Sequence, residues 1–247
     1  MPEAPLVSIL LDWLSFRDFA RLDSALCNKK SRAELQQSIL ASRHTISTEW
    51  ADYGEPKAEW LIKHGIRCRT AWLGCKLMAD PLLREQFLIY SGHELLSVHL
   101  GLGNLVTEET KDVTPSSLRE IVHGLAVHCP GLKKIKITMN WNKYILSSDD
   151  FTALHTFVMS RAALKSLTLR GIELVPLSFV VMALAQLTFV SLENCSVAND
   201  ITITTLPPCR ASFKCLNTPL PPELCAHVTE LTANCLSTSK RTELREL

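Results

Sequence analysis

The chain has 247 residues, of which 47% are hydrophobic, and its 26 Lys and Arg against 25 Asp and Glu give a net charge of +1. A chain of this length can bury one sizeable core, or a small module beside a larger one, and its composition excludes the disordered and collagenous classes. The near-neutral charge offers no global field to a polyanion or a membrane surface, so we predict neither nucleic acid nor membrane as a partner.

The nine cysteines and eight histidines are scattered without the close paired spacing of metal ligands. Several cysteines stand where Leu or Val would complete an apolar pattern, which is typical of small buried side chains in a reducing compartment. The N-terminal stretch fails as a secretory signal because its start is acidic and Asp12 interrupts its apolar run. We therefore predict no metal, no cofactor and a cytoplasmic or nuclear location.

Residues 1–60 are predicted to form a small helical module. The first helix carries apolar residues at helical spacing on one face, namely Leu6, Ile9, Leu10, Trp13 and Leu14. A short break follows, and Asp18 then precedes a second apolar helix that includes Leu22. At that position the Asp18 side chain can cap the free backbone amides of the second helix.

Residues 61–247 repeat the leucine-rich template L-x-x-L-x-L-x-x-N/C, in which alternate apolar residues of a short strand face inward. LKKIKITMN from Leu132 and LTFVSLENC from Leu187 match every position, while the segments from Leu95 and Leu164 each depart once. The prediction is a set of parallel strands at 66–73, 95–100, 132–138, 164–170 and 187–193. A weaker strand is predicted in VTELTANC, which ends at Cys235.

The segments between these strands predict helices that return the chain. Thr114 and Pro115 suit the start of a helix over 115–129, which Pro130-Gly131 ends. A second helix over 149–162 starts with two Asp residues, which favour the positive helix end. The fold class is therefore α/β, a leucine-rich-repeat solenoid with helices on its convex side, preceded by the helical module.

An uncharged stretch from Val175 to Leu192 is long enough to be considered for a membrane span. Pro176 and several polar residues interrupt it, and its second half fits the repeat. The repeat is therefore the preferred interpretation.

The segment ILLDWLSFRDFARLDSALCNK resembles the middle of an F-box through Trp13-Leu14, Asp18-Phe19, Leu22 and Leu26-Cys27. An F-box followed by leucine-rich repeats is similar in its order of parts to the substrate receptors of SCF-type cullin-RING ubiquitin ligases. This resemblance implies that the N-terminal helices dock on a Skp1-like adaptor of the cullin complex and that the repeats hold a protein substrate. The implied adaptor-binding residues are Leu10, Trp13, Leu14, Asp18 and Leu22.

The strand alternation also predicts which side chains face the concave side, where solenoids generally bind their partners. The predicted substrate-binding residues on that side are mostly cationic: Arg67, Arg69, His99, Lys134, Lys136 and Arg170. A partner with acidic or phosphorylated groups would complement them. The alternative is that these are solvated surface charges.

Three functional hypotheses remain open from the sequence. The first is the ubiquitin-ligase substrate receptor, and the second is a non-catalytic repeat scaffold whose N-terminal helices only cap the solenoid. The third, a catalytic domain, lacks a visible constellation of nucleophile, base and orienting group, so we predict that the protein is not an enzyme. Asp149 and Asp150 could form an acid/base pair, but helix-start charges are the commoner case.

Overall fold

The computed structural model describes most of the repeat region and little of the N-terminal module. The described residues are 29–31, 33–34, 45–47, 58–63, 67–74, 77, 80–102, 118–139, 146–201, 212–221, 224 and 231–234. The five predicted adaptor-binding residues lie outside these ranges. The predicted boundary between residues 60 and 61 falls inside a described helix, α4 (Ala58–Lys63).

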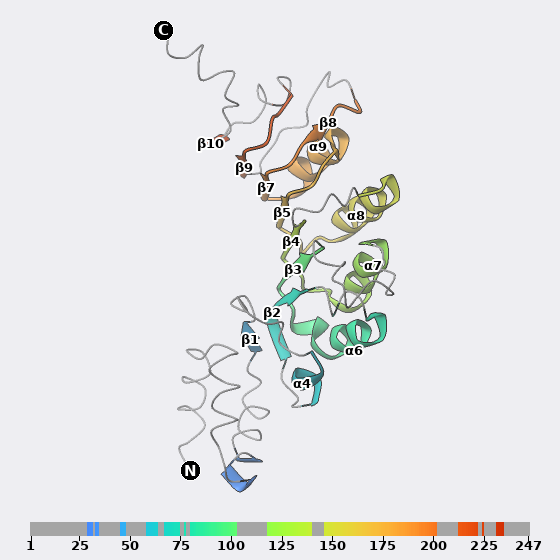
Figure 1. The fold of residues 1–247 in the computed structure, drawn as a ribbon, viewed down its shortest axis with the longest axis vertical. Helices are drawn as coiled ribbons and strands as arrows, with labels where there is room; N and C mark the ends of the chain where they lie inside the picture. The colour runs from blue at the N-terminus through green and yellow to red at the C-terminus, as the bar shows by residue number, and fades with distance from the viewer. Residues whose placement is uncertain are drawn as a thin grey trace, which may run out of the picture.

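An eight-stranded parallel sheet runs along the molecule in the order β1-β2-β3-β4-β5-β7-β9-β10. Its strands are β1 (Thr45–Ser47), β2 (Arg67–Leu73), β3 (Ser97–Gly101), β4 (Lys134–Thr138), β5 (Ser166–Arg170), β7 (Phe189–Glu193), β9 (Ser212–Leu216) and β10 (Leu231–Asn234). The strands follow a shallow arc, and the helices lie on its convex side (Figure 1). This arrangement confirms the α/β class and the parallel stacking of the predicted strands.

The helices that cover one face of the sheet are α4, α6 (Pro81–Ser91), α7 (Leu118–His128), α8 (Ser148–Ser160) and α9 (Leu177–Gln186) (Figure 1). A 3-10 turn, η1 (Gly92–Glu94), follows α6, and the short strands β6 (Val175–Pro176) and β8 (Val197–Ala198) form a separate pair. The described return helices therefore all lie on the same side of the sheet (Figure 1).

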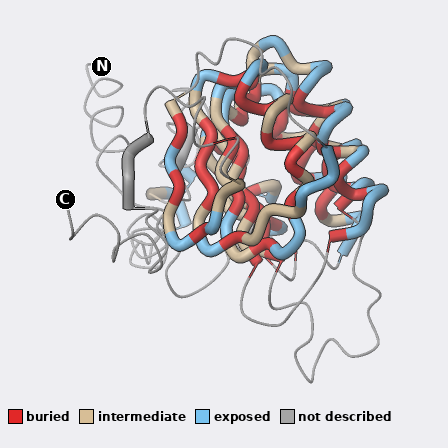
Figure 2. Tube along the Cα trace, turned by 90° about the horizontal axis from the view of Figure 1, so that it is seen from above, coloured by how far each residue is buried: buried red, intermediate tan, exposed pale blue. Residues whose placement is uncertain are grey.

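The core lies between the sheet and the helix layer, where buried residues line both (Figure 2). The apolar positions of the template align across the strands, so that Val98, Ile135, Leu167 and Val190 form one buried row. A second row contains Leu100, Ile137, Leu169 and Leu192. The first leucine of the template is also buried in four units, at Leu95, Leu132, Leu164 and Leu187. Each of these residues lies two positions before the start of its strand. The repeat pattern thus accounts for the buried residues of these four strands.

Capping explains where the helices begin. The Ser147 hydroxyl accepts a hydrogen bond from the Asp150 amide at 3.1 Å, and the Asp150 carboxylate accepts one from the Ser147 amide at 3.1 Å. This capping box opens α8 and occupies Asp150, which supports the helix-start interpretation of the two aspartates. At α9 the cap comes from Asp200, because Pro176 has no capping side chain and the Ser178 amide donates to Asp200 at 2.9 Å.

The uncharged stretch from Val175 is divided among β6, α9 and β7. In the described part of the chain, no helix has both the length and the apolar character needed to cross a membrane.

Two strands of the sheet were not predicted. β1 adds to the edge beside β2, although residues 45–47 were assigned to the helical module. β9 lies beside β7, with Phe213 opposite Val190 and Cys215 opposite Leu192. The template position three residues before Phe213 is Arg210, a charged residue, so the motif is not visible there.

The described thiols confirm the prediction of buried cysteines. Cys68, Cys129, Cys195 and Cys215 are buried. Burial raises the pKa of the Cys68 and Cys129 thiols to about 12, so both remain protonated at neutral pH. These side chains therefore behave as small apolar core residues.

Replacing Leu167 by Ala should destabilise the fold by about 2–5 kcal/mol, because the change leaves a cavity in a close-packed row. Leu167 is fully buried between Ile135 and Val190 in register. Urea denaturation measures the loss, with Thr168→Ala on the opposite side of the same strand as the matched control. The control should change stability by no more than about 0.5 kcal/mol. Equal effects of the two variants would contradict the buried position of Leu167.

Candidate functional site

The sheet face opposite the helices lies on the concave side of the arc, and we call it the outer face (Figure 1). It is built from the template positions between the buried residues. Its side chains align in three rows across the strands because the register is continuous. The first row is Thr70, Ser97, Lys134, Ser166, Phe189 and Ser212. The second row is Trp72, His99, Lys136, Thr168, Ser191 and Lys214. The third row is Gly101, Thr138, Arg170, Glu193 and Leu216.

Arg67 and Arg69 do not lie in these rows. Their predicted alignment with the outer-face residues of β3 is wrong, because Thr70 and Trp72 lie opposite Ser97 and His99. The register shifts by one residue at Arg69, since Ile46 pairs with Cys68 and Ser47 with Thr70.

Arg67 also interacts with residues of its own unit. Its guanidinium lies 3.5 Å from Glu94 and 5.9 Å from the centre of the Tyr90 ring. The basic row predicted from the sequence therefore does not extend in register onto β2.

Lys134, Lys136 and Arg170 form the positive part of the outer face and are called the cation cluster. Lys134 and Arg170 are exposed, and Lys136 is half-buried. Among the described residues no carboxylate forms an ion pair with these three side chains. The nearest carboxylate in register is Glu193, which lies 3.5 Å from the ammonium of Lys214. The cluster therefore presents positive charge that no described carboxylate neutralises.

His99 lies beside the cation cluster on β3. Its ring stacks on Trp72, with centroids 5.4 Å apart and planes 13° from parallel, and its Nε2 is 2.7 Å from the Thr138 hydroxyl. Burial is the largest cause of the low His99 pKa and the positive charges of Lys136 and Arg170 add to it, so that together they lower the pKa to about 4. The imidazole is thus neutral at pH 7, and it contributes polar contacts instead of the positive charge of an imidazolium.

Trp72 was not among the predicted site residues. A side-chain carbon added to Gly101 would lie 2.8 Å from its indole Nε1, so glycine is required where the indole packs against β3. Trp72 and His99 therefore form an aromatic wall along one edge of the cation cluster. Aligning β2 from Cys68 would have revealed Trp72, because Cys68, Ala71 and Leu73 fill the three apolar template positions.

The outer face carries two kinds of hydrogen-bond donor. Lysine and arginine side chains lie among serine and threonine hydroxyls, and together they can donate hydrogen bonds to carboxylates or phosphates. Over the described ranges, no three His, Cys, Asp or Glu side chains gather where they could hold a metal ion.

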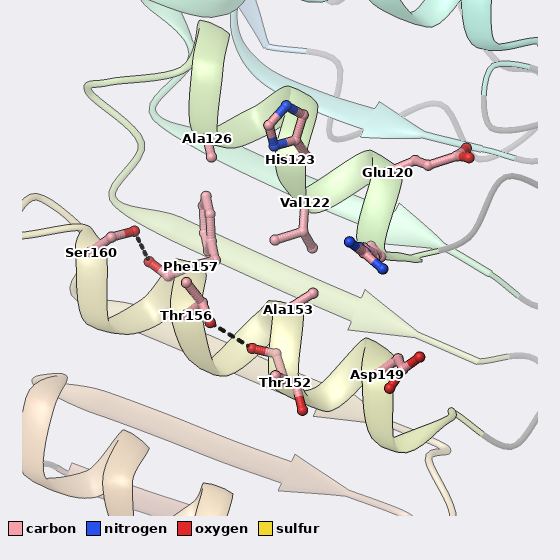
Figure 3. Close-up of a pocket in the computed structure, with 11 residues that line it drawn as sticks. Glu120, Val122, His123, Ala126, Asp149, Thr152, Ala153, Thr156, Phe157 and Ser160 are labelled. Carbon is pink, nitrogen blue, oxygen red and sulfur yellow. Dashed lines mark hydrogen bonds between the residues drawn. The ribbon is translucent and has the colours of Figure 1, made fainter.

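A groove of about 680 Å³ lies on the helical side between α7 and α8 (Figure 3). Val122 and Ala153 face it from the two helices. Its three hydroxyls, on Thr152, Thr156 and Ser160, donate to carbonyls of α8 itself. Glu120 extends away from α8 and lies 4.0 Å from Arg84 of α6. The groove thus lies between the small side chains of two helices, and its hydroxyl groups bond within the fold.

The comparisons with protein-family models, curated proteins and solved structures found no match for this chain.

The stability of the protein should depend on His99 as the pH falls. The native pKa of about 4 lies below the ordinary value of 6.5, so between these values the unfolded state binds more protons and stability declines with falling pH. The free energy of unfolding of the wild type should fall about 1 kcal/mol more between pH 7 and pH 5 than that of His99→Gln, since the ring is partly solvated.

Urea denaturation at several pH values measures this difference. The other titrating groups are the same in both proteins, so their contribution cancels in the comparison. A difference between the two proteins that stays constant over this pH range would contradict the burial of a neutral His99.

Proposed function

We propose that the chain is a leucine-rich-repeat solenoid protein that binds a protein partner on the outer face of its sheet and catalyses no reaction itself. The observation that carries this proposal is the cation cluster, whose three members lie in three successive rows of the outer face. No described carboxylate forms an ion pair with them. An acidic or phosphorylated partner would supply the missing negative charge.

The repeat assignment is supported by the stacking of short parallel strands with returning helices on one side. The template positions fill the buried rows, and in the C-terminal units Cys195 and Thr218 occupy the polar position. The Cys195 amide donates to the Thr218 hydroxyl at 3.0 Å, so these residues connect consecutive units as the template expects.

The proposed biological role is that of a substrate receptor in an SCF-type cullin-RING ubiquitin ligase. The F-box resemblance around Trp13 and Asp18, followed by repeats, supports this role, as does the apolar character of Leu6 to Leu14 on more than one helical face. A surplus apolar face suits an adaptor interface. The alternative is a scaffold in which the same helices only cap the repeats, and the two roles differ in whether a Skp1-like adaptor binds.

Replacing Lys134 and Lys136 by Glu should abolish capture of acidic partners, because the change reverses the charge of two rows of the outer face. Affinity purification with quantitative mass spectrometry compares the variant with wild type. The matched control is Lys63→Glu with Arg119→Glu, which changes the net charge equally on α4 and α7. Wild-type capture should weaken as salt is raised. Equal capture by wild type and the outer-face variant would show that the partner binds elsewhere.

Replacing Leu10 by Glu should abolish binding of a Skp1-like adaptor, because aliphatic and aromatic anchors dominate such interfaces. Co-expression and co-purification with the adaptor measure binding, and Lys29→Glu at an exposed position is the control. Adaptor binding by neither the wild type nor the variants, with circular dichroism showing folded chains, would favour the capping role.

A further inference from the structure

The cation cluster runs along the strands instead of across the sheet. Lys134 and Lys136 are two residues apart on β4, which places their backbone positions about 6.6 Å apart at roughly 3.3 Å per residue. Arg170 lies opposite Thr138, the next outer-face residue of β4. The three cations therefore occupy three successive levels along β4 and β5, and each outer-face row contains one member of the cluster.

Each level also offers a hydroxyl beside its cation. Lys134 lies opposite Ser166, and Lys136 lies opposite Thr168. At the third level the order is reversed, with Thr138 on β4 and Arg170 on β5. A carboxylate has two oxygens, so at each level one oxygen can accept from the cation and the other from the neighbouring hydroxyl.

The flanks of the cluster disfavour a ligand that crosses the strands. On the β3 side, the Trp72–His99 wall carries no positive charge at pH 7. On the β7 side, Glu193 lies opposite Arg170 and would repel an acidic group. A ligand laid along any one row would meet only one cation of the cluster, whereas a ligand laid along β4 and β5 would meet all three.

We propose that the outer face binds an extended acidic peptide segment whose acidic side chains stand at alternate positions and whose backbone runs along β4 and β5. In an extended chain, side chains at i, i+2 and i+4 share one side and are spaced like the levels of the cluster. In a helix, neighbours on one face are instead three and four residues apart, and only about 5–6 Å separates them. This inference rests on the proposed function and specifies its partner.

The Thr138 hydroxyl links the third level to His99. When His99 Nε2 carries the hydrogen it donates to the Thr138 oxygen, which leaves the Thr138 O–H available for a ligand carboxylate. The charged groups that face His99 from the neighbouring strands are Lys136 on β4 and Arg170 on β5, and Trp72 on β2 is neutral. A carboxylate placed between these cations would offset their effect, so the pKa of His99 reports whether the site is occupied.

The test uses three labelled peptides of identical composition, each with three Glu residues among Thr and Ser. In the first the Glu residues alternate, in the second they are contiguous, and in the third they are four residues apart. Fluorescence anisotropy at low salt should show that the full-length protein binds the alternating peptide at least about fivefold more tightly than either of the others, which is about 1 kcal/mol. A fourth peptide with phosphoserine at the alternating positions separates phosphorylated from carboxylate ligands.

Two variants and one spectroscopic measurement locate the binding. Arg170→Gln should remove most of the preference for the alternating peptide, and Arg119→Gln on α7 should leave it unchanged. In NMR titrations of the histidine rings, the alternating peptide should raise the pKa of the signal that His99→Gln removes.

The remaining outcomes separate this inference from the proposed function. If all three peptides bind equally and Lys134→Glu with Lys136→Glu abolishes their binding, the outer face binds acidic partners but the alternating arrangement is wrong. If no acidic peptide binds the folded wild type, both the inference and the proposed acidic partner are overturned.

Discussion

The continuous parallel register of the sheet is the constraint on which both the core and the outer face depend. Ile135 lies opposite Leu167 on the buried side, and Lys136 lies opposite Thr168 on the outer face. Because successive side chains alternate between faces, a slip of one residue would expose the apolar rows and bury the cations. The buried apolar residues of the pattern fix the register of the strands. This register in turn determines where the residues between them, including the cation cluster, lie on the outer face.

The turns that follow the strands maintain this register from one unit to the next. Gly171, Asn194 and Asn217 occupy the position after β5, β7 and β9 with positive φ, a conformation that glycine and asparagine tolerate best. At Gly171 there is no room for a side chain, because an added carbon would lie 2.5 Å from the Met139 carbonyl oxygen. Asn217 donates to Asn194 at 3.0 Å, so the C-terminal units are connected at the turns as well as through the strands.

The sequence predicted the parts of the fold in which large aliphatic residues fill the apolar template positions. The units at Leu132, Leu164 and Leu187 were located from their apolar spacing, and the cations on β4 and β5 followed from strand alternation. The alignment of β2 was wrong because Cys68 and Ala71 replace larger residues and Arg69 interrupts the alternation. β9 was missed because its first template position is charged. Such substitutions are tolerated because neighbouring units supply the packing that a single strand lacks.

The aromatic wall shows why the outer face cannot be understood from its charges alone. Trp72 reaches His99 and Gly101 across a strand boundary, so its role depends on residues that are distant in the sequence. The wall borders the cation cluster, because His99 lies opposite Lys136 in register. Burial is the largest cause of the low His99 pKa, and the two cations that lower it as well, Lys136 and Arg170, form no ion pair with a described carboxylate. An anion bound between these cations would therefore raise the His99 pKa.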